Sequence, residues 1–447
     1  MDPDTETGPL GLHAEYLPNI RQVSVQISVP ADTHPEISLS ESRRAVSVSV
    51  SLSEPVGYVS ETIKLPARVT EGSRRILRDA NVARNGSCTG LGTDIGREFS
   101  YRMQVDDAEL VQRGAVEELM DNFVPWAAGD MAASTKLRCG QCERVIIDTP
   151  DVATSSSLLD EHSALQSASW VWKDLPSGNW AEMMDFWHCH KPDPLEGQDD
   201  HGPDKHLVED ENSKVKGYGA SNQVLATPGT VLVDVATFLI SDIECKGLKK
   251  VTKESTDGSL VPSEDELICD GCNTLIGVQD SIAKGWRLFK TSLAASVASS
   301  EEGSDEVNVN WQKHPTELVV AAQLLELIER ESARRFIIHC GKQDGLLLWV
   351  FNPDMRYSNS SSHHSITSQR AMKVFFQNAA NVEAMLHPEV GKTSSLSLEE
   401  LRLPVGTYAS FATALEASNK MLPQSARTFK GNWRVGILHR LERRKRT

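Results

Sequence analysis

Two distant stretches of the chain share one pattern: Cys139-Gly140-Gln141-Cys142 leads into Val145-Ile146-Ile147, and Cys269-Asp270-Gly271-Cys272 leads into Leu275-Ile276-Gly277. Each stretch has the form of a zinc knuckle, in which a tight turn aims two thiolates at one point and a short strand leads away. Two knuckles together provide the four sulfurs of a tetrahedral metal site. We therefore predict one structural Zn²⁺ ion, bound by the following residues: Cys139, Cys142, Cys269 and Cys272.

The two knuckles are separated by residues 143–268, a much longer interval than in a compact zinc ribbon. The entropy of closing a loop grows only with the logarithm of its length, so this interval costs roughly 1.7 kcal/mol more than a loop of about 18 residues. Structural zinc contributes about 10–16 kcal/mol in small domains. The shared site is therefore favoured over two alternatives that remain open, namely two unrelated structural turns or a redox Cys-x-x-Cys pair.

The composition indicates a globular protein of a reducing compartment. Its 447 residues are 39% hydrophobic, which is enough for two or three domains that each bury a core. No run approaches the roughly 18 apolar residues of a membrane span, and the N-terminus is acidic, unlike a signal peptide. Eight cysteines in so long a chain suit the nucleus and cytoplasm. The formal charge of −16 favours protein partners over direct nucleic-acid binding, and we expect no membrane association.

The apolar pattern predicts an α+β protein with three parts. Apolar and polar residues alternate over residues 23–29 and 46–52, as in half-buried strands, so we expect an N-terminal antiparallel β domain over residues 1–137. Residues 138–290 hold the cysteine pairs between long polar stretches and form the predicted zinc-knuckle region. Residues 311–447 mix helical and strand patterns, which predicts a C-terminal mixed α/β domain.

Local signals place several elements in the C-terminal part. Pro315 and Pro404 each precede an apolar stripe with helical spacing. Apolar runs over residues 336–340 and 346–351 flank a turn that contains two glycines, which predicts a hairpin. Ser-rich tracts such as residues 292–304 are predicted to be mobile.

A second chemical signal lies between the knuckles, in the run Leu175-Pro176-Ser177-Gly178-Asn179-Trp180 and its continuation Trp187-His188-Cys189-His190-Lys191-Pro192. Asn179 has the position of an N-cap, and Trp180 and Trp187 fall on one face of the short helix that follows. Three metal-capable side chains then stand in a row, of which at most two can reach one ion: His188, Cys189 and His190. In the alternative interpretation, the histidines complement the helix dipole and the cysteine is packed in the core.

These two signals, in this order, resemble the HECT-like ubiquitin-conjugating-enzyme-binding family, described in animals and fungi as an accessory ubiquitin ligase. The resemblance rests on both knuckles, the Leu-Pro-Ser-x-Asn-Trp helix, the Trp-x-Cys-His segment and the hairpin that ends in Leu347-Leu348-Trp349, and it covers most of residues 60–440. It implies ubiquitin-protein ligase activity with a ubiquitin-conjugating enzyme as partner. Because a zinc-bound thiolate is neutralised and sterically closed, we expect no ubiquitin thioester on Cys269 or Cys272.

The same resemblance implies a second, non-enzymatic function. Members of the family are linked to the machinery that cleaves messenger-RNA precursors at their 3′ ends. The Trp-x-Cys-His segment is similar to a metal-binding tail that caps a metallo-β-lactamase-type RNA endonuclease. In this alternative the chain is an inhibitor-chaperone of that endonuclease. Cys189, with His188 or His190, would bind the partner's metal, and Trp180 and Trp187 would anchor the contact.

Overall fold

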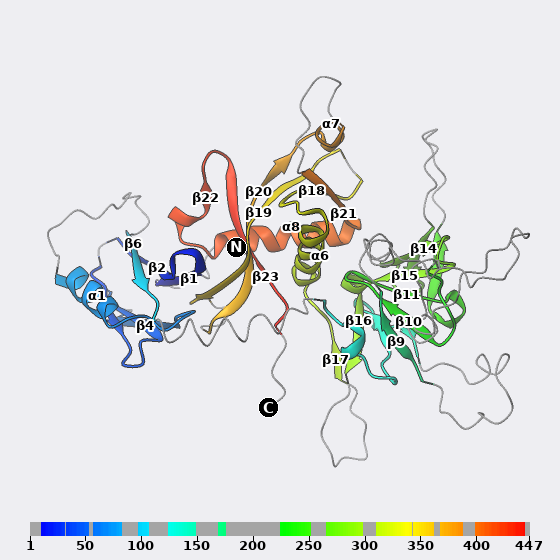
Figure 1. The fold of residues 1–447 in the computed structure, drawn as a ribbon, viewed down its shortest axis with the longest axis horizontal. Coiled ribbons are helices and arrows are strands. Elements are labelled where there is room, and N and C mark those ends of the chain that lie inside the picture. The colour runs from blue at the N-terminus through cyan, green and yellow to red at the C-terminus, as the bar shows by residue number, and fades with distance from the viewer. Residues whose placement is uncertain are drawn as a thin grey trace, which may run out of the picture. The chain divides into compact units, whose positions relative to one another are not determined.

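The computed structural model describes most of the chain, namely residues 10–31, 33–52, 57–82, 97–106, 124–148, 169–175, 224–251, 265–297, 310–341, 343–361, 367–387 and 398–442. These residues are mostly β, with few helices (Figure 1). The chain divides into two compact units: unit 1 comprises Met1–Phe123 and Ala333–Thr447, and unit 2 comprises Val124–Ser332. No helix in the described part is long and apolar enough to span a membrane.

Unit 1 is built on a sheet to which both ends of the chain contribute. Its nine described strands are β1 (Gly11–Leu17), β2 (Gln22–Val29), β6 (Arg97–Gln104), β18 (Arg335–His339), β19 (Gly345–Asn359), β20 (Gln369–Ala379), β21 (Leu398–Arg402), β22 (Thr428–Phe429) and β23 (Trp433–His439). The main path runs β22-β23-β20-β19-β1-β2-β6, and β18 pairs with both β19 and β21. The long strand β19 therefore pairs with β18 along its first part and with β1 along its last part.

The remaining elements of unit 1 are short strands and helices. A three-stranded sheet contains β3 (Glu36–Leu39), β4 (Ala45–Ser51) and β5 (Tyr58–Lys64), and the helices are α1 (Gly72–Val82), α7 (Val382–Leu386), α8 (Val405–Lys420) and the 3-10 turns η1 (Pro18–Ile20) and η5 (Gln424–Ala426). The alternation predicted for β2 and β4 is confirmed, because every second side chain of each strand is buried. Helix α1 was not predicted from the sequence.

Helix α8 covers one face of the nine-stranded sheet. Pro404 stands at the N-cap of this helix, as the sequence predicts, and the helix residues Phe411 and Leu415 are fully buried. A Cβ atom at Gly436 would lie 2.9 Å from Leu415 Cδ2, so a larger residue at this point of β23 would have to displace the Leu415 side chain.

A buried polar network joins β1 to the C-terminal strands. His13 lies opposite Asn359 in the ladder between β1 and β19, and Asn359 Nδ2 donates to His13 Nδ1 at 3.1 Å. The other ring nitrogen of His13 lies 3.0 Å from Glu15 Oε1, and Lys373 Nζ donates to both Glu15 oxygens at 2.8 Å. Burial acts to raise the pKa of Glu15, but the Lys373 charge and the His13 hydrogen bond outweigh it and hold this pKa well below its usual range.

Unit 2 consists mainly of two sheets. The seven-stranded sheet contains β9 (Val171–Asp174), β10 (Thr230–Val233), β11 (Thr237–Ile240), β12 (Leu248–Val251), β13 (Glu266–Cys269), β14 (Leu275–Asp280) and β15 (Gly285–Phe289). The four-stranded sheet contains β7 (Leu137–Cys139), β8 (Val145–Ile147), β16 (Leu293–Val297) and β17 (Asn310–Gln312). Among the described residues of this unit, the α-helix is α6 (Thr316–Glu331), and the 3-10 turns are η2 (Ala128–Asp130), η3 (Asp242–Glu244) and η4 (Lys290–Ser292). Side chains of both sheets belong to one hydrophobic core, which includes the fully buried Ile146 and Ile276.

The two units do not coincide with the three parts expected from the sequence. The N-terminal β segment and the C-terminal α/β segment share one sheet, because β1 pairs directly with β19. Unit 2 contains the whole predicted knuckle region and extends beyond it to helix α6, which begins after Pro315 as predicted. The start of the Ser-rich tract at residues 292–304 is a strand instead of a mobile segment, since β16 pairs with β7.

Candidate metal centre

Each cysteine pair lies on a turn of the same local geometry. The residue after each Cys-x-x-Cys motif has a left-handed backbone, with φ of 64° at Glu143 and 60° at Asn273. The Glu143 N–H donates to Cys139 O at 3.1 Å, and the Asn273 N–H donates to Cys269 O at 2.9 Å. The repeated pattern in the sequence therefore corresponds to a repeated fold of the backbone.

A short hairpin carries each turn. The Cys139 N–H donates to Arg144 O at 2.7 Å at the end of β7, and the Cys269 N–H donates to Thr274 O at 2.9 Å at the end of β13. Strands β8 and β14 then lead away, as the apolar residues after each motif predict. Because these hairpins belong to different sheets that share one core, the fold brings the two turns together across the long interval between them.

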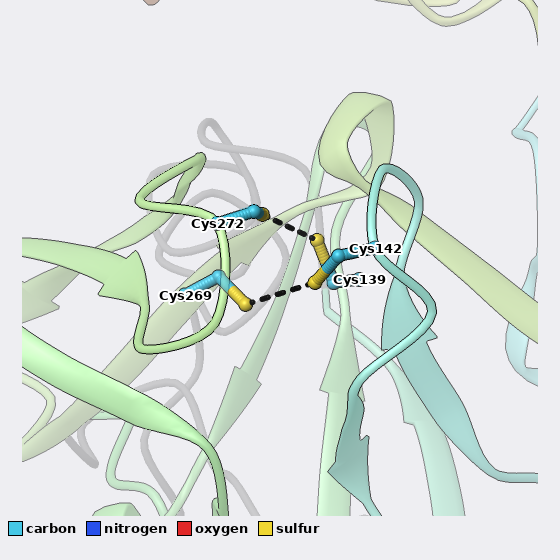
Figure 2. Close-up of side chains that lie close together, drawn as sticks. All are labelled: Cys139, Cys142, Cys269 and Cys272. Carbon is cyan, nitrogen blue, oxygen red and sulfur yellow. Dashed lines mark hydrogen bonds between the residues drawn. The ribbon is translucent and has the colours of Figure 1, made fainter.

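The four sulfur atoms meet at one point (Figure 2). Cys139 Sγ lies 3.7 Å from Cys272 Sγ, Cys142 Sγ lies 3.5 Å from Cys269 Sγ, and all four lie within 4.8 Å of one another. Zn–S bonds of about 2.3 Å in a tetrahedron place sulfur atoms about 3.8 Å apart, whereas a disulfide needs about 2.05 Å. The arrangement fits four thiolates around a single ion, and all four positions of a tetrahedral ion would be filled by protein.

The four thiols have different surroundings. Cys139 and Cys269 are buried, whereas Cys142 is exposed. Burial raises the pKa of Cys139, while the hydroxyl of Thr274, 3.1 Å from Cys272 Sγ, lowers the pKa of Cys272 to about 6. At neutral pH Cys272 thus offers a thiolate more readily than Cys139, and a bound cation would be needed to hold the buried Cys139 in its charged form.

Charged side chains lie beside the four cysteines, and one ion pair links the two turns. Arg144 of the first turn forms an ion pair with Asp270 of the second. The Arg144 side chain is half exposed, so this pair contributes little stability by itself. Lys313 Nζ lies 3.5 Å from Gly140 O and adds a second positive charge near the sulfurs, which would complement the net negative charge of a four-thiolate zinc site.

The structure thus brings together the four cysteines that the sequence assigns to one site, and their spacing is compatible with a metal. Cys245 lies apart from this group and is partly buried. The second predicted set, which comprises His188, Cys189, His190, Trp180 and Trp187, lies outside the described residues. Sequence reasoning did not single out Arg144, Asp270 or Thr274, although each stands within two residues of a motif cysteine and that proximity was the available signal.

Comparison with known proteins finds one family and two relatives. The family model described as HECT-like Ubiquitin-conjugating enzyme (E2)-binding matches residues 15–435. The uncharacterized protein YJR141W of Saccharomyces cerevisiae is 26% identical over 266 residues, which cover 59% of this chain and 62% of that protein, so less than two thirds of that relative is spanned. The uncharacterized protein C1734.10c of Schizosaccharomyces pombe is 25% identical over 327 residues, which cover 70% of this chain and 77% of that protein. No solved structure matches.

Proposed function

Because the chain belongs to the HECT-like ubiquitin-conjugating enzyme (E2)-binding family, we propose that it binds an E2 and acts as an accessory ubiquitin ligase without carrying ubiquitin itself. The match over residues 15–435 is the observation that carries this proposal, since it covers all of unit 2 and most of unit 1. The E2 retains the ubiquitin thioester in this mechanism, and the chain contributes the docking surface.

The surroundings of the cysteines support the proposal that the E2, and not this chain, carries the ubiquitin thioester. A HECT-type ligase needs an accessible thiolate that accepts ubiquitin from the E2. Four of the cysteines with described positions lie together in a geometry that suits a metal, where a thiolate is neutralised and closed to attack. Burial raises the pKa of Cys245 far above its ordinary value, so this thiol is a poor nucleophile as well.

The transfer step then takes place on the E2. A substrate lysine amine attacks the carbonyl carbon of the E2–ubiquitin thioester, forming the isopeptide C–N bond as the C–S bond breaks. The lysine loses a proton, and the departing sulfur leaves as the E2 thiol. The step balances without an oxidant, a reductant or a second protein thiol.

A binding panel tests the proposal. The full-length chain is immobilised and purified E2 enzymes are passed over it one at a time, first uncharged and then charged with ubiquitin. We expect saturable binding of at least one E2, with the modest affinity typical of transient signalling contacts. Absence of saturable binding by every E2 up to hundreds of micromolar would refute the proposal.

A further inference from the structure

One face of the sheet in unit 1 carries a cluster of aromatic side chains. This aromatic face comprises Trp349 and Phe351 of β19, Phe375 of β20, Phe429 of β22 and Trp433 of β23. The Trp349 ring lies 5.3 to 6.4 Å, centre to centre, from the other four rings, and Phe429 stacks on Phe375 at 4.4 Å. The side chain of Phe351 is 50% exposed, while those of Trp349, Phe429 and Trp433 are partly buried.

Strand register places this cluster on the face opposite helix α8. Trp349 pairs with Phe375, and Phe375 pairs with Val435, so these three side chains share one face. The next residue, Gly436, faces Leu415 of α8. Because side chains alternate along a strand, Val435 and the aromatic residues paired with it point away from the helix. Phe375 and Val435 belong to a separate core that also includes Leu422, and the other rings except Phe351 pack against it. Phe351 is the ring that this core leaves half exposed.

Two positively charged side chains beside the aromatic face indicate what kind of group would bind to it. The Arg335 guanidinium lies 5.5 Å from the centre of the Trp349 ring, and Lys430 Nζ lies 6.0 Å from that of Phe429. Two cations thus flank the aromatic rings in a chain whose formal charge is −16. Aromatic residues and arginine are the side chains enriched at the centres of protein interfaces, and carboxylates are the groups that complement flanking cations.

The geometry points to the aromatic face as the docking site for the E2, and this inference rests on the proposed function above. A fitting E2 surface presents an apolar side chain with carboxylates beside it. The apolar side chain packs against Phe351 and Trp349, and a carboxylate pairs with Arg335. Arg335 is held over the Trp349 ring by its cation–π contact, so less rotamer freedom is lost when the partner binds.

Two substitutions test the site without removing its buried members. Phe351→Ser removes the half-exposed ring, and Arg335→Glu reverses the flanking charge. The matched control is Ile243→Ser in unit 2, because Ile243 is also an exposed apolar side chain, at 61%. Each full-length variant is titrated with the E2 that binds the wild-type chain. Melting temperature and circular dichroism verify that the fold is retained.

We expect Phe351→Ser and Arg335→Glu each to weaken E2 binding about tenfold or more, and Ile243→Ser to change it less than twofold. Added salt should weaken wild-type binding and should no longer weaken binding to Arg335→Glu. If the wild-type chain binds an E2 and both variants bind it equally well, the docking site is wrong and the proposed function stands. If no E2 binds the wild-type chain, both fail. If the variants lose self-association in sedimentation velocity and keep E2 binding, the face is a dimer contact and the inference is overturned.

Discussion

Substituting Cys142 by serine separates the contribution of a metal from that of packing. The Cys142 side chain is exposed, whereas Cys139 and Cys269 are buried. An exposed cysteine that has no other role tolerates serine within about 0.5 kcal/mol. A metal ligand does not, because removing one of four thiolates opens the coordination sphere. Any large loss of stability in Cys142→Ser must therefore arise through the metal.

The size of the effect follows from the four-sulfur arrangement. Structural zinc contributes about 10–16 kcal/mol, so an equal share for each of four ligands is about 3 kcal/mol. For a unit of roughly 200 residues, a loss of this size lowers the melting temperature by about 6–12 °C. The expected result for Cys142→Ser is a fall in this range, accompanied by weaker zinc binding, so that a chelator removes the ion from the variant more readily than from the wild-type chain.

The assay pairs calorimetric melting with metal analysis by mass spectrometry on the same samples. Cys245→Ser is the matched control, because Cys245 lies in unit 2 and outside the sulfur cluster. It should retain one zinc per chain. A wild-type chain that contains no metal and melts identically with and without a strong chelator would refute the reasoning.

Three further predictions concern Lys290, Glu15 and Cys189. Lys290 is fully buried and donates to Pro125 O at 2.7 Å, and burial lowers its pKa from 10.5 to about 7. Between pH 7 and pH 10.5 the unfolded chain binds more protons than the folded chain, so the free energy of unfolding of unit 2 should rise by about 4 kcal/mol over this range. Urea titrations at several pH values should find this rise in the wild-type chain and no such rise in Lys290→Met. Glu15→Gln should lower the stability of unit 1 by about 3 kcal/mol in urea titrations, since Lys373 loses its buried carboxylate partner, and an unchanged midpoint would show that the pair is dispensable. In the alternative function that the family resemblance implies, Cys189→Ala should leave the melting temperature and zinc content unchanged and weaken capture of a metallo-β-lactamase-type RNA endonuclease in a pull-down. Reduced stability with unchanged capture would indicate a packed cysteine instead.

Local patterns were sufficient for much of the fold. The alternation in β2 depends on neighbours two residues apart, and the helix after Pro404 depends on a stop signal and an apolar stripe, so both can be read from one segment. The hairpin between β18 and β19 has the same local origin. Each Cys-x-x-Cys motif is equally local. The prediction that the two motifs lie together came from the four sulfur ligands that a tetrahedral metal site needs.

The features that escaped prediction depend on contacts between distant segments. The pairing of β1 with β19 joins residues that lie 342 to 346 positions apart in the sequence, and nothing in either strand specifies its partner. The same holds for the contact of Glu15 with Lys373, since a buried glutamate is indistinguishable from an exposed one in the sequence. The aromatic face was likewise hidden, because its members come from four strands that only the sheet order places side by side.

The central claim is that the chain assists an E2 and does not itself carry ubiquitin. A single-turnover chase tests it most directly: a purified E2 charged with ubiquitin is mixed with the chain and free lysine, and products are separated with and without reductant. We predict faster discharge of the E2 onto lysine and no reducible ubiquitin adduct on the chain. A reducible adduct that disappears in Cys269→Ser or Cys272→Ser, while the fold persists, would contradict it.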